Sequence, residues 1–323
     1  MADAADAGKQ CLPIGIFDSG VGGLTVLAAL LKRLPHERYC YLGDTARLPY
    51  GTKSAATIVR YSLQVAEKLV ALDIKLLVVA CNTASAAALP QLRQRYPHLP
   101  VLGVIEPGAK AACTLSRSGD IIVLATESTI RGEAYTRAIQ ALRPEARVIG
   151  IPCTLFVSLA EEGWISGQVA EAVAARYLSS ALAGWNGVQS RSGDGRPADG
   201  PDRPVAPDCL VLGCTHFPPL APVIRSVAGE GVTLVDSAAT TAQAVEEHLR
   251  ELDLLRPVSC AESAGLRIRV PDASRSGADR DPEAGILSRL RLLTTDAPER
   301  FARVGGLFLG MPLDPEAIEL MTL

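Results

Sequence analysis

Residues 76–83 have the sequence LLVVACNT, in which a run of aliphatic side chains ends on Cys81 and a polar pair. A second run, LVLGCTH at residues 210–216, repeats this arrangement around Cys214. Short continuous apolar runs bounded by turn-forming residues are typical of strands buried on both faces of a parallel sheet. We therefore predict two buried strands in equivalent places, each with a cysteine at its carboxyl end.

Strand and helix patterns alternate outward from these two runs. The first predicted strands are 14–17, 39–42, 76–80 and 101–105, with helices over 25–34, 54–72 and 85–96 and a closing turn at 106–108. The pattern then restarts, with strands at 121–125, 147–151, 209–212 and 232–235 and helices at 131–141, 156–162, 166–182 and 238–252. This alternation predicts an α/β fold of two tandem doubly wound parallel-sheet domains. Because such sheets bind ligands beyond the carboxyl ends of their strands, the active site is expected in the cleft between the domains.

Two polar stretches interrupt the pattern, at 186–208 and 261–283. The first is rich in Gly, Ser, Pro and Asp, and the second is similar, so both are predicted to be surface insertions.

The composition is that of an ordinary globular chain, with 323 residues, 48% of them hydrophobic and 21% charged. A net charge of −3 and an aromatic content of 4% argue against direct nucleic-acid binding. No apolar run approaches the roughly 18 residues of a membrane span. The first residues also lack the positive charge of a signal peptide. The expected location is the cytoplasm.

The chain has eight cysteines and no CxxC pair. In a long chain without a secretory signal, this argues against both a disulfide framework and a metal centre. Six are predicted to be inert thiols that pack as small hydrophobes: Cys11, Cys40, Cys113, Cys153, Cys209 and Cys260.

Cys81 and Cys214 are the main candidates for catalysis. An isolated strand-end cysteine is usually structural, but two in matched contexts, each followed by polar side chains, favour a catalytic pair. Both stand where a strand ends, so backbone N–H groups are expected to favour the thiolate and to bring about a modest pKa shift. Two thiols facing one substrate from opposite sides provide the acid and the base that inversion of a carbon stereocentre requires.

A glycine-rich stretch, DSGVGG at 18–23, follows the first predicted strand. It is close to a dinucleotide-binding fingerprint, with Asp44 near the position of the ribose-binding acid. However, Thr25 stands at the third glycine position, and Asp18 would place a carboxylate beside the pyrophosphate. Asp18 fits a substrate ammonium, or a base near a thiol, better.

Several polar residues are further candidates, although each also has a simpler interpretation as a cap, a turn or a structural residue. His216, two residues after Cys214, is a candidate proton carrier. For Glu161, the sequence indicates only a charged residue on a predicted helix. The candidates for binding a carboxylate are Tyr50, Gly51, Asn82, Thr83, Thr126 and Thr129.

Five blocks in this order resemble the glutamate racemase family of the aspartate/glutamate racemase superfamily. They are GIFDSGVGG at 15–23, GDTARLPYG at 43–51, ACNTAS at 80–85, GVIEP at 103–107 and LGCTHFP at 212–218. The resemblance runs from about residue 13 to about residue 252, and a weaker match follows at 294–301. It departs at the two insertions and at 126–129, where the family often has a glycine before the second threonine.

The resemblance implies a cofactor-independent racemase that interconverts L- and D-glutamate and supplies D-glutamate for peptidoglycan synthesis. It implies that Cys81 takes the α-proton from D-glutamate and Cys214 takes it from L-glutamate. Asp18 is implied beside the first thiol, and His216 and Glu161 near the second. The implied substrate-binding positions are Asp18, Ser19, Tyr50, Gly51, Asn82, Thr83, Thr126, Thr129, Thr215 and His216.

We expect a first domain of about 1–103 plus 237–323, which carries Cys81, and a second domain of 104–236, which carries Cys214. A homodimer is expected from the habit of the family. Some members bind DNA gyrase or respond to a cell-wall precursor, and no pattern in this sequence bears on either property. The alternatives are an aspartate racemase of the same superfamily, a nucleotide-dependent oxidoreductase and a non-catalytic binding module.

Overall fold

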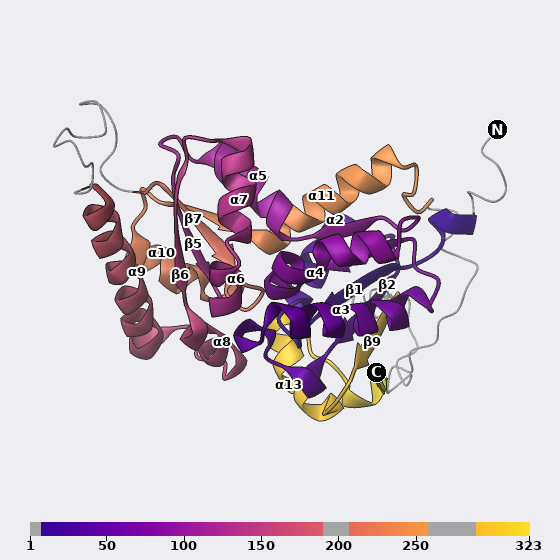
Figure 1. The fold of residues 1–323 in the computed structure, drawn as a ribbon. Coiled ribbons are helices and arrows are strands. Elements are labelled where there is room, and N and C mark those ends of the chain that lie inside the picture. The colour runs from indigo at the N-terminus through magenta and orange to yellow at the C-terminus, as the bar shows by residue number, and fades with distance from the viewer. Residues whose placement is uncertain (1–7, 190–206, 258–288) are drawn as a thin grey trace, which may run out of the picture.

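The computed structural model describes residues 8–189, 207–257 and 289–323. Its strands form two sheets that lie side by side (Figure 1), and every strand pair in them is parallel. The six-stranded sheet has the order β10-β9-β2-β1-β3-β4. Its strands are β1 (Ile14–Asp18), β2 (Tyr39–Gly43), β3 (Leu76–Val79), β4 (Val101–Gly103), β9 (Leu290–Thr294) and β10 (Ile318–Leu320).

The second sheet has four strands in the order β6-β5-β7-β8. These are β5 (Asp120–Ala125), β6 (Arg147–Pro152), β7 (Cys209–Gly213) and β8 (Thr233–Asp236). The α-helices are α2 (Leu24–Arg33), α3 (Ala55–Val70), α4 (Asn82–Arg95), α5 (Ile105–Leu115), α6 (Glu127–Arg131), α7 (Ala134–Leu142), α8 (Thr154–Glu161), α9 (Gly167–Gln189), α10 (Ala221–Ala228), α11 (Ser237–Glu251) and α13 (Pro298–Leu309). Short 3-10 helices cover η1 (Thr45–Arg47), η2 (Tyr50–Thr52), η3 (Pro218–Leu220) and η5 (Pro315–Ala317).

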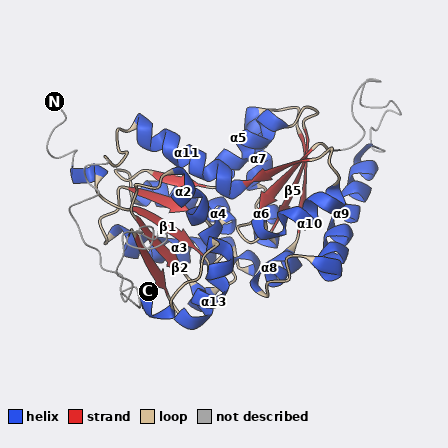
Figure 2. Cartoon of the chain, turned by 180° about the vertical axis from the view of Figure 1, so that it is seen from behind, coloured by secondary structure: helices blue, strands red, loops and turns tan. Residues whose placement is uncertain are grey.

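Helices cover both faces of the six-stranded sheet, as expected for parallel strands with buried faces (Figure 2). Successive strand residues alternate between two cores because side chains point to opposite faces. Ile16 and Val78 join the core that includes α2 and α11, whereas Phe17 and Val79 join the core that includes α3 and α4. The first of these cores continues without a break into the second sheet.

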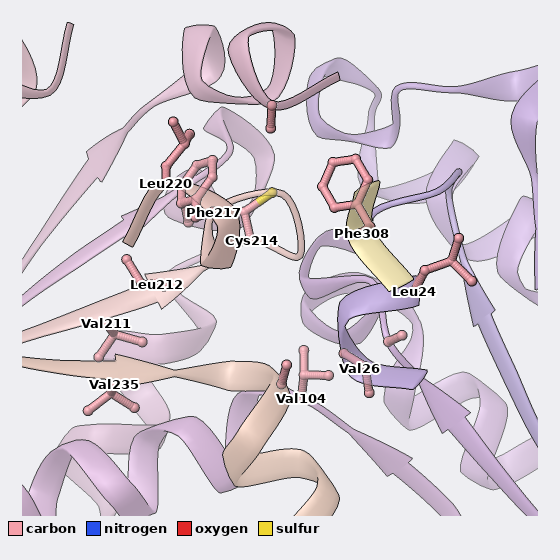
Figure 3. Packing of buried hydrophobic residues seen from close by; sticks show 14 of the residues in the cluster. Leu24, Val26, Val104, Val211, Leu212, Cys214, Phe217, Leu220, Val235 and Phe308 are labelled. Atoms are coloured by element: carbon pink, nitrogen blue, oxygen red, sulfur yellow. The ribbon is translucent and has the colours of Figure 1, made fainter. Parts of the chain in front are cut away.

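This shared core fills the space between the sheets with aliphatic and aromatic side chains. Figure 3 shows Leu24 and Val26 of α2 on one side and Val211 and Val235 of the second sheet on the other. Val104, between β4 and α5, lies among them. The two sheets therefore do not pack as independent bodies but share buried surface next to the strand ends.

The predicted doubly wound parallel architecture is confirmed, and the predicted strands agree with the structure to within a residue or two. The strand predicted at 101–105 is too long by two residues, because β4 ends at Gly103 and α5, a helix that was not predicted, begins at Ile105. The turn predicted at 106–108 lies in the first turn of α5, where proline is tolerated because its missing N–H would have no partner. The start of the loop predicted at 186–208 is also wrong, since α9 continues to Gln189. Residues 190–206 and the insertion predicted at 261–283 lie outside the described residues.

The carboxyl-terminal segment contributes structure that the sequence patterns did not predict. Strand β9 pairs with β2, and β10 pairs with β9 in parallel at the edge of the sheet. Helix α13 packs against α2. In Figure 1 this yellow segment lies beside the indigo strands from the start of the chain.

The prediction of inert thiols is wrong for Cys11, which is disulfide-bonded. Cys40, Cys113, Cys153 and Cys209 are free thiols, and Cys260 lies outside the described residues. Among the described residues, no helix has the length and hydropathy needed to cross a bilayer.

A buried ion pair holds the amino-terminal ends of the first sheet together. Lys75 precedes β3 and Glu37 precedes β2, and their charged atoms lie 2.6 Å apart with both side chains buried. The Lys75 ammonium also donates to the carbonyl oxygens of Gln10 and Leu254, each at 2.8 Å. One buried charge thus links the segment before β1 to the segment after α11, at the end of the strands opposite Cys81.

The variant Lys75→Met is expected to lose about 3–5 kcal/mol of unfolding free energy, because it leaves the Glu37 carboxylate buried without its counter-charge. Urea unfolding measures this loss. Lys32→Met, at an exposed position of α2, is the matched control and should stay within about 0.5 kcal/mol of the parent. Equal stability of the two variants would contradict the prediction.

Candidate active site

The two candidate cysteines lie at matched places in the two sheets. Cys81 follows β3 and is the N-cap of α4, and Cys214 follows β7. Each is buried, with 5% of its surface exposed. The charge of Cys214 contributes to the pKa of Cys81, so the two thiols lie within electrostatic reach of each other. The strand-end placement predicted from the sequence is confirmed.

Cys81 is surrounded by groups from the first sheet. Its thiol donates to Ser19 Oγ at 3.7 Å and accepts from the Ala84 N–H at 3.4 Å. Burial raises the pKa of the Cys81 thiol to about 12, the charge of Asp18 adds to this increase, and the two hydrogen bonds oppose it only in part. The expected modest pKa shift is therefore wrong for Cys81, because burial outweighs the helix N-terminus. Cys81 is a protonated thiol at neutral pH.

Cys214 belongs to a chain of ionisable groups that crosses from one sheet to the other. Its Sγ lies 3.9 Å from His216 Nδ1, and His216 Nε2 lies 3.1 Å from Glu161 Oε1 at the end of α8. Arg300 of α13 donates to the other oxygen of Glu161 at 2.8 Å. Figure 3 shows Cys214 between Phe217 and Phe308, which keep apolar surface around the thiol.

The charges in this chain set the protonation of His216. Burial alone would lower the pKa of His216, but its hydrogen bonds to Cys214 and Glu161, together with the charges of Cys214 and Asp18, raise it to about 10. Burial alone would raise the pKa of Glu161, but His216 and Arg300 hold it below its usual value. His216 is thus an imidazolium paired with a carboxylate at neutral pH, which suits a proton carrier beside a thiol.

Asp18 connects the surroundings of the two thiols. Burial raises its pKa, while the charge of His216 and the N–H groups of residues 19, 20 and 23 act in the opposite direction. Thr215 donates to Asp18 Oδ1 at 3.5 Å, and Thr25 donates to the Thr215 carbonyl at 3.1 Å. The polar loop after β7 is therefore hydrogen-bonded to the strand end and helix start of the first sheet.

The glycine-rich turn after β1 makes this approach possible. A Cβ at Gly22 would lie 2.4 Å from His216 Nδ1 and 2.5 Å from Thr215 Oγ1, and a Cβ at Gly23 would lie 2.6 Å from the Cβ of Asp18. Contacts this short cannot be accommodated without movement. Gly22 is thus explained by close packing against the Cys214 loop, and Gly23 by close packing within the first sheet, rather than by a pyrophosphate.

A cluster of hydroxyl groups joins the sheets beside Cys81. Thr83 Oγ1 lies 2.9 Å from Thr126 Oγ1 and 3.3 Å from Thr129 Oγ1, and the last two are 3.0 Å apart. A Cβ at Gly51 would lie 2.8 Å from the Cβ of Thr126. The candidate anion-binding residues of the two sheets are therefore adjacent.

The Tyr50 hydroxyl has a different partner from the one expected. It donates to Asp44 Oδ2, and the Tyr50 side chain is buried. Asp44 also accepts from Arg47 Nε at 2.7 Å and from Thr295 Oγ1 at 3.0 Å. Asp44, considered above as a ribose-binding acid, is thus used to hold the 45–51 loop.

Two residues at the site were not found from the sequence. Tyr135, on α7, donates to Asn82 Oδ1 at 2.7 Å. Arg300 lies in the weak match at 294–301, which was the single sequence signal for it.

A cavity of about 170 Å³ opens beside the Glu161–Arg300 ion pair. Its lining residues are Val21, Thr45, Leu48, Glu161, Asp296, Ala297, Arg300, Phe301 and Val304.

Comparison with known proteins identifies the family. A model of the Asp/Glu/Hydantoin racemase family matches residues 20–181. A glutamate racemase of Geobacter metallireducens is 48% identical over 297 residues, which cover 92% of each protein. The chain belongs to the glutamate racemase family. It is a racemase, and hence an isomerase, as the resemblance implied.

Solved structures have the same fold as this racemase. Glutamate racemase from Francisella tularensis, in complex with D-glutamate, matches with a TM-score of 0.73 and 31% identity, covering 97% of this chain and 98% of that one. Glutamate racemase from Thermus thermophilus, in complex with beta-chloro-D-alanine, matches with a TM-score of 0.73 and 35% identity, covering 98% of each chain. Within the described part of the racemase, no cluster of His, Cys, Asp and Glu has the arrangement of a metal site.

The variant Gly22→Ala is expected to reduce racemase activity about 100-fold, because its Cβ would displace the loop that carries Cys214, and displacements near 1 Å have effects of this size. Initial rates in both directions measure the change. Gly231→Ala is the matched control, because a Cβ there meets no atom within 4 Å, and it should keep full activity. A fully active Gly22→Ala variant would mean that the loop does not need this close approach.

The His216 interaction should also appear in the pH dependence of stability. Its pKa is about 10 in the folded protein against 6.5 as its ordinary value. A raised folded-state pKa gives a stabilisation that is complete below pH 6.5 and is lost as the pH rises through about 10. Glu161→Gln removes a carboxylate that favours the imidazolium, so it should lower the pKa of His216 and narrow this pH window.

NMR titration of the His216 ring measures the pKa, and urea unfolding between pH 6 and pH 10 measures the stability. Glu162→Gln changes the exposed neighbour of Glu161 and should leave both results as in the parent. An identical His216 midpoint in the parent and in Glu161→Gln would refute the assignment of the pair.

Proposed function

We propose that this chain is a cofactor-independent glutamate racemase that interconverts L- and D-glutamate with Cys81 and Cys214 as its two bases. The observation that carries the proposal is the pair of buried thiols, one from each parallel sheet, within electrostatic reach of each other and each beside its own ionisable groups. Glutamate as the substrate is supported by the relatives that are named glutamate racemases. One of them is 48% identical to this chain.

The proposed reaction moves one proton off the α-carbon and delivers another to its opposite face. With L-glutamate, the Cys214 thiolate takes the α-proton, the C–H electron pair stays on carbon, and Cys81 donates its thiol proton to the other face. With D-glutamate the roles reverse. The pKa of the Cys81 thiol is raised to about 12, which supports its role as the acid when L-glutamate is converted to D-glutamate.

The neighbouring groups have distinct roles in this proposal. Asp18 acts beside Cys81, and His216 with Glu161 carries the proton to and from Cys214. Because no pyridoxal phosphate delocalises the carbanion, hydrogen bonds in a site closed to water must stabilise the charge. The proposed substrate-binding residues are Asp18, Ser19, Tyr50, Gly51, Asn82, Thr83, Thr126, Thr129, Thr215 and His216.

We propose that the domains are 1–103 plus 237–323 and 104–236. All strands of the six-stranded sheet fall in the first set of residues, and all strands of the four-stranded sheet fall in the second, which supports the division. We further propose that the protein is a cytoplasmic homodimer that supplies D-glutamate for peptidoglycan synthesis, in keeping with the family.

The variants Cys81→Ala and Cys214→Ala are each expected to abolish racemisation in both directions, because each direction needs one thiol as base and the other as acid. Circular dichroism of L- and D-glutamate in D2O, without added cofactor, follows racemisation, and NMR follows deuterium at Cα. Cys113→Ala, at a partly buried cysteine of α5, is the control and should keep parent activity.

Full activity of either cysteine variant would refute the two-base mechanism. The parent protein is assayed with aspartate alongside glutamate. Racemisation of aspartate alone would replace glutamate as the substrate, and inertness toward both would overturn the proposed function.

A further inference from the structure

Tyr135 lies between the two halves of the site without belonging to any of the sequence motifs. Its hydroxyl donates to Asn82 Oδ1 at 2.7 Å, although Tyr135 is on α7 beside the second sheet and Asn82 begins α4 beside the first. Tyr135 is 3% exposed and Asn82 is 2% exposed. The hydrogen bond is therefore buried and joins the two sheets next to Cys81.

The other end of the Asn82 amide has no protein partner. Nδ2 is buried, and it makes no hydrogen bond within the described part of the chain. An amide has one acceptor oxygen and two N–H donors, and buried polar groups are almost always paired. Since Tyr135 occupies the oxygen, the unpaired donors are left on the residue that follows Cys81, where a bound anion would satisfy them.

The tyrosine ring has little freedom to move. A Cβ at Gly213 would lie 3.0 Å from Tyr135 Cε2, and a Cβ at Gly108 would lie 3.2 Å from the Tyr135 hydroxyl oxygen. Gly213 directly precedes Cys214. The ring is thus packed between the start of α5 and the end of β7, so its hydroxyl holds a fixed place relative to Cys214.

We propose that Tyr135 is a positioning residue that orients the Asn82 amide so that its Nδ2–H donors face the carboxylate of an amino acid held between Cys81 and Cys214. This inference rests on the proposed function. Tyr135 acts through Asn82 and does not touch the reacting carbon. Its loss therefore weakens the binding of both enantiomers while leaving the proton transfers in place.

The test replaces Tyr135 with phenylalanine in the full chain and measures kcat and KM for L- and D-glutamate. KM should rise about tenfold in both directions, the size expected when donors to a charged group lose their alignment, and kcat should change by less than about threefold. Tyr177→Phe is the matched control, because the Tyr177 hydroxyl accepts from the Leu155 N–H; its KM should equal that of the parent. A purely structural role for Tyr135 would lower the unfolding temperature with KM unchanged.

A double-mutant cycle with Asn82→Ala tests the route of the effect. If Tyr135 acts through Asn82, Tyr135→Phe adds no further rise in KM to Asn82→Ala. Should Tyr135→Phe fail to fold, Asn82→Asp keeps the acceptor for Tyr135 and removes the donors, so its KM should rise at least as much.

An active parent with unchanged KM in Tyr135→Phe, or in Asn82→Asp, overturns this inference alone, as does full additivity in the cycle. A parent that racemises neither glutamate nor aspartate overturns the proposed function and this inference together.

Discussion

The contact on which the rest of the site depends is the approach of the Cys214–His216 loop to the glycine turn after β1. It places a histidine and a threonine where a single added methyl group at Gly22 would collide with both. Because the loop belongs to one sheet and the turn to the other, the contact fixes the carboxyl ends of the two sheets against each other. The thiols, the hydroxyl cluster and the Glu161–Arg300 pair all depend on that alignment.

The seam between the sheets combines an apolar core with a small set of compensated charges. Asp18 is fully buried and His216 nearly so, and each influences the pKa of the other. Arg300, at the edge of the seam, completes the chain of alternating charges through Glu161. Such alternation lets a buried site hold several ionisable groups because each lies beside an opposite charge. Cys81 stays a thiol mainly because burial raises its pKa, and the charge of Asp18 adds to this increase.

Local patterns were enough to predict the parallel sheets and the strand-end cysteines, because buried strands have continuous apolar runs that turn residues interrupt. Helix α5 was missed because Pro107 and Gly108 are typical of turns, yet proline is tolerated in a first helical turn. Helix α13 was missed because Gly305 and Gly306 weaken its helical pattern. The contacts of Tyr135 and Arg300 join residues far apart in the chain, which no local pattern encodes.

The order of the chain has a consequence for synthesis on the ribosome. Strand β2 forms early, but its outer neighbour β9 is made roughly 250 residues later, so β2 remains an unpaired edge while most of the protein is translated. Helix α13, which brings Arg300 to Glu161 and Phe308 to His216, is also made late. The nascent chain therefore carries an unpaired strand edge and lacks the Arg300–Glu161 contact until residues 290–309 have left the tunnel. It gains this contact and protection from edge-to-edge aggregation in the same late step.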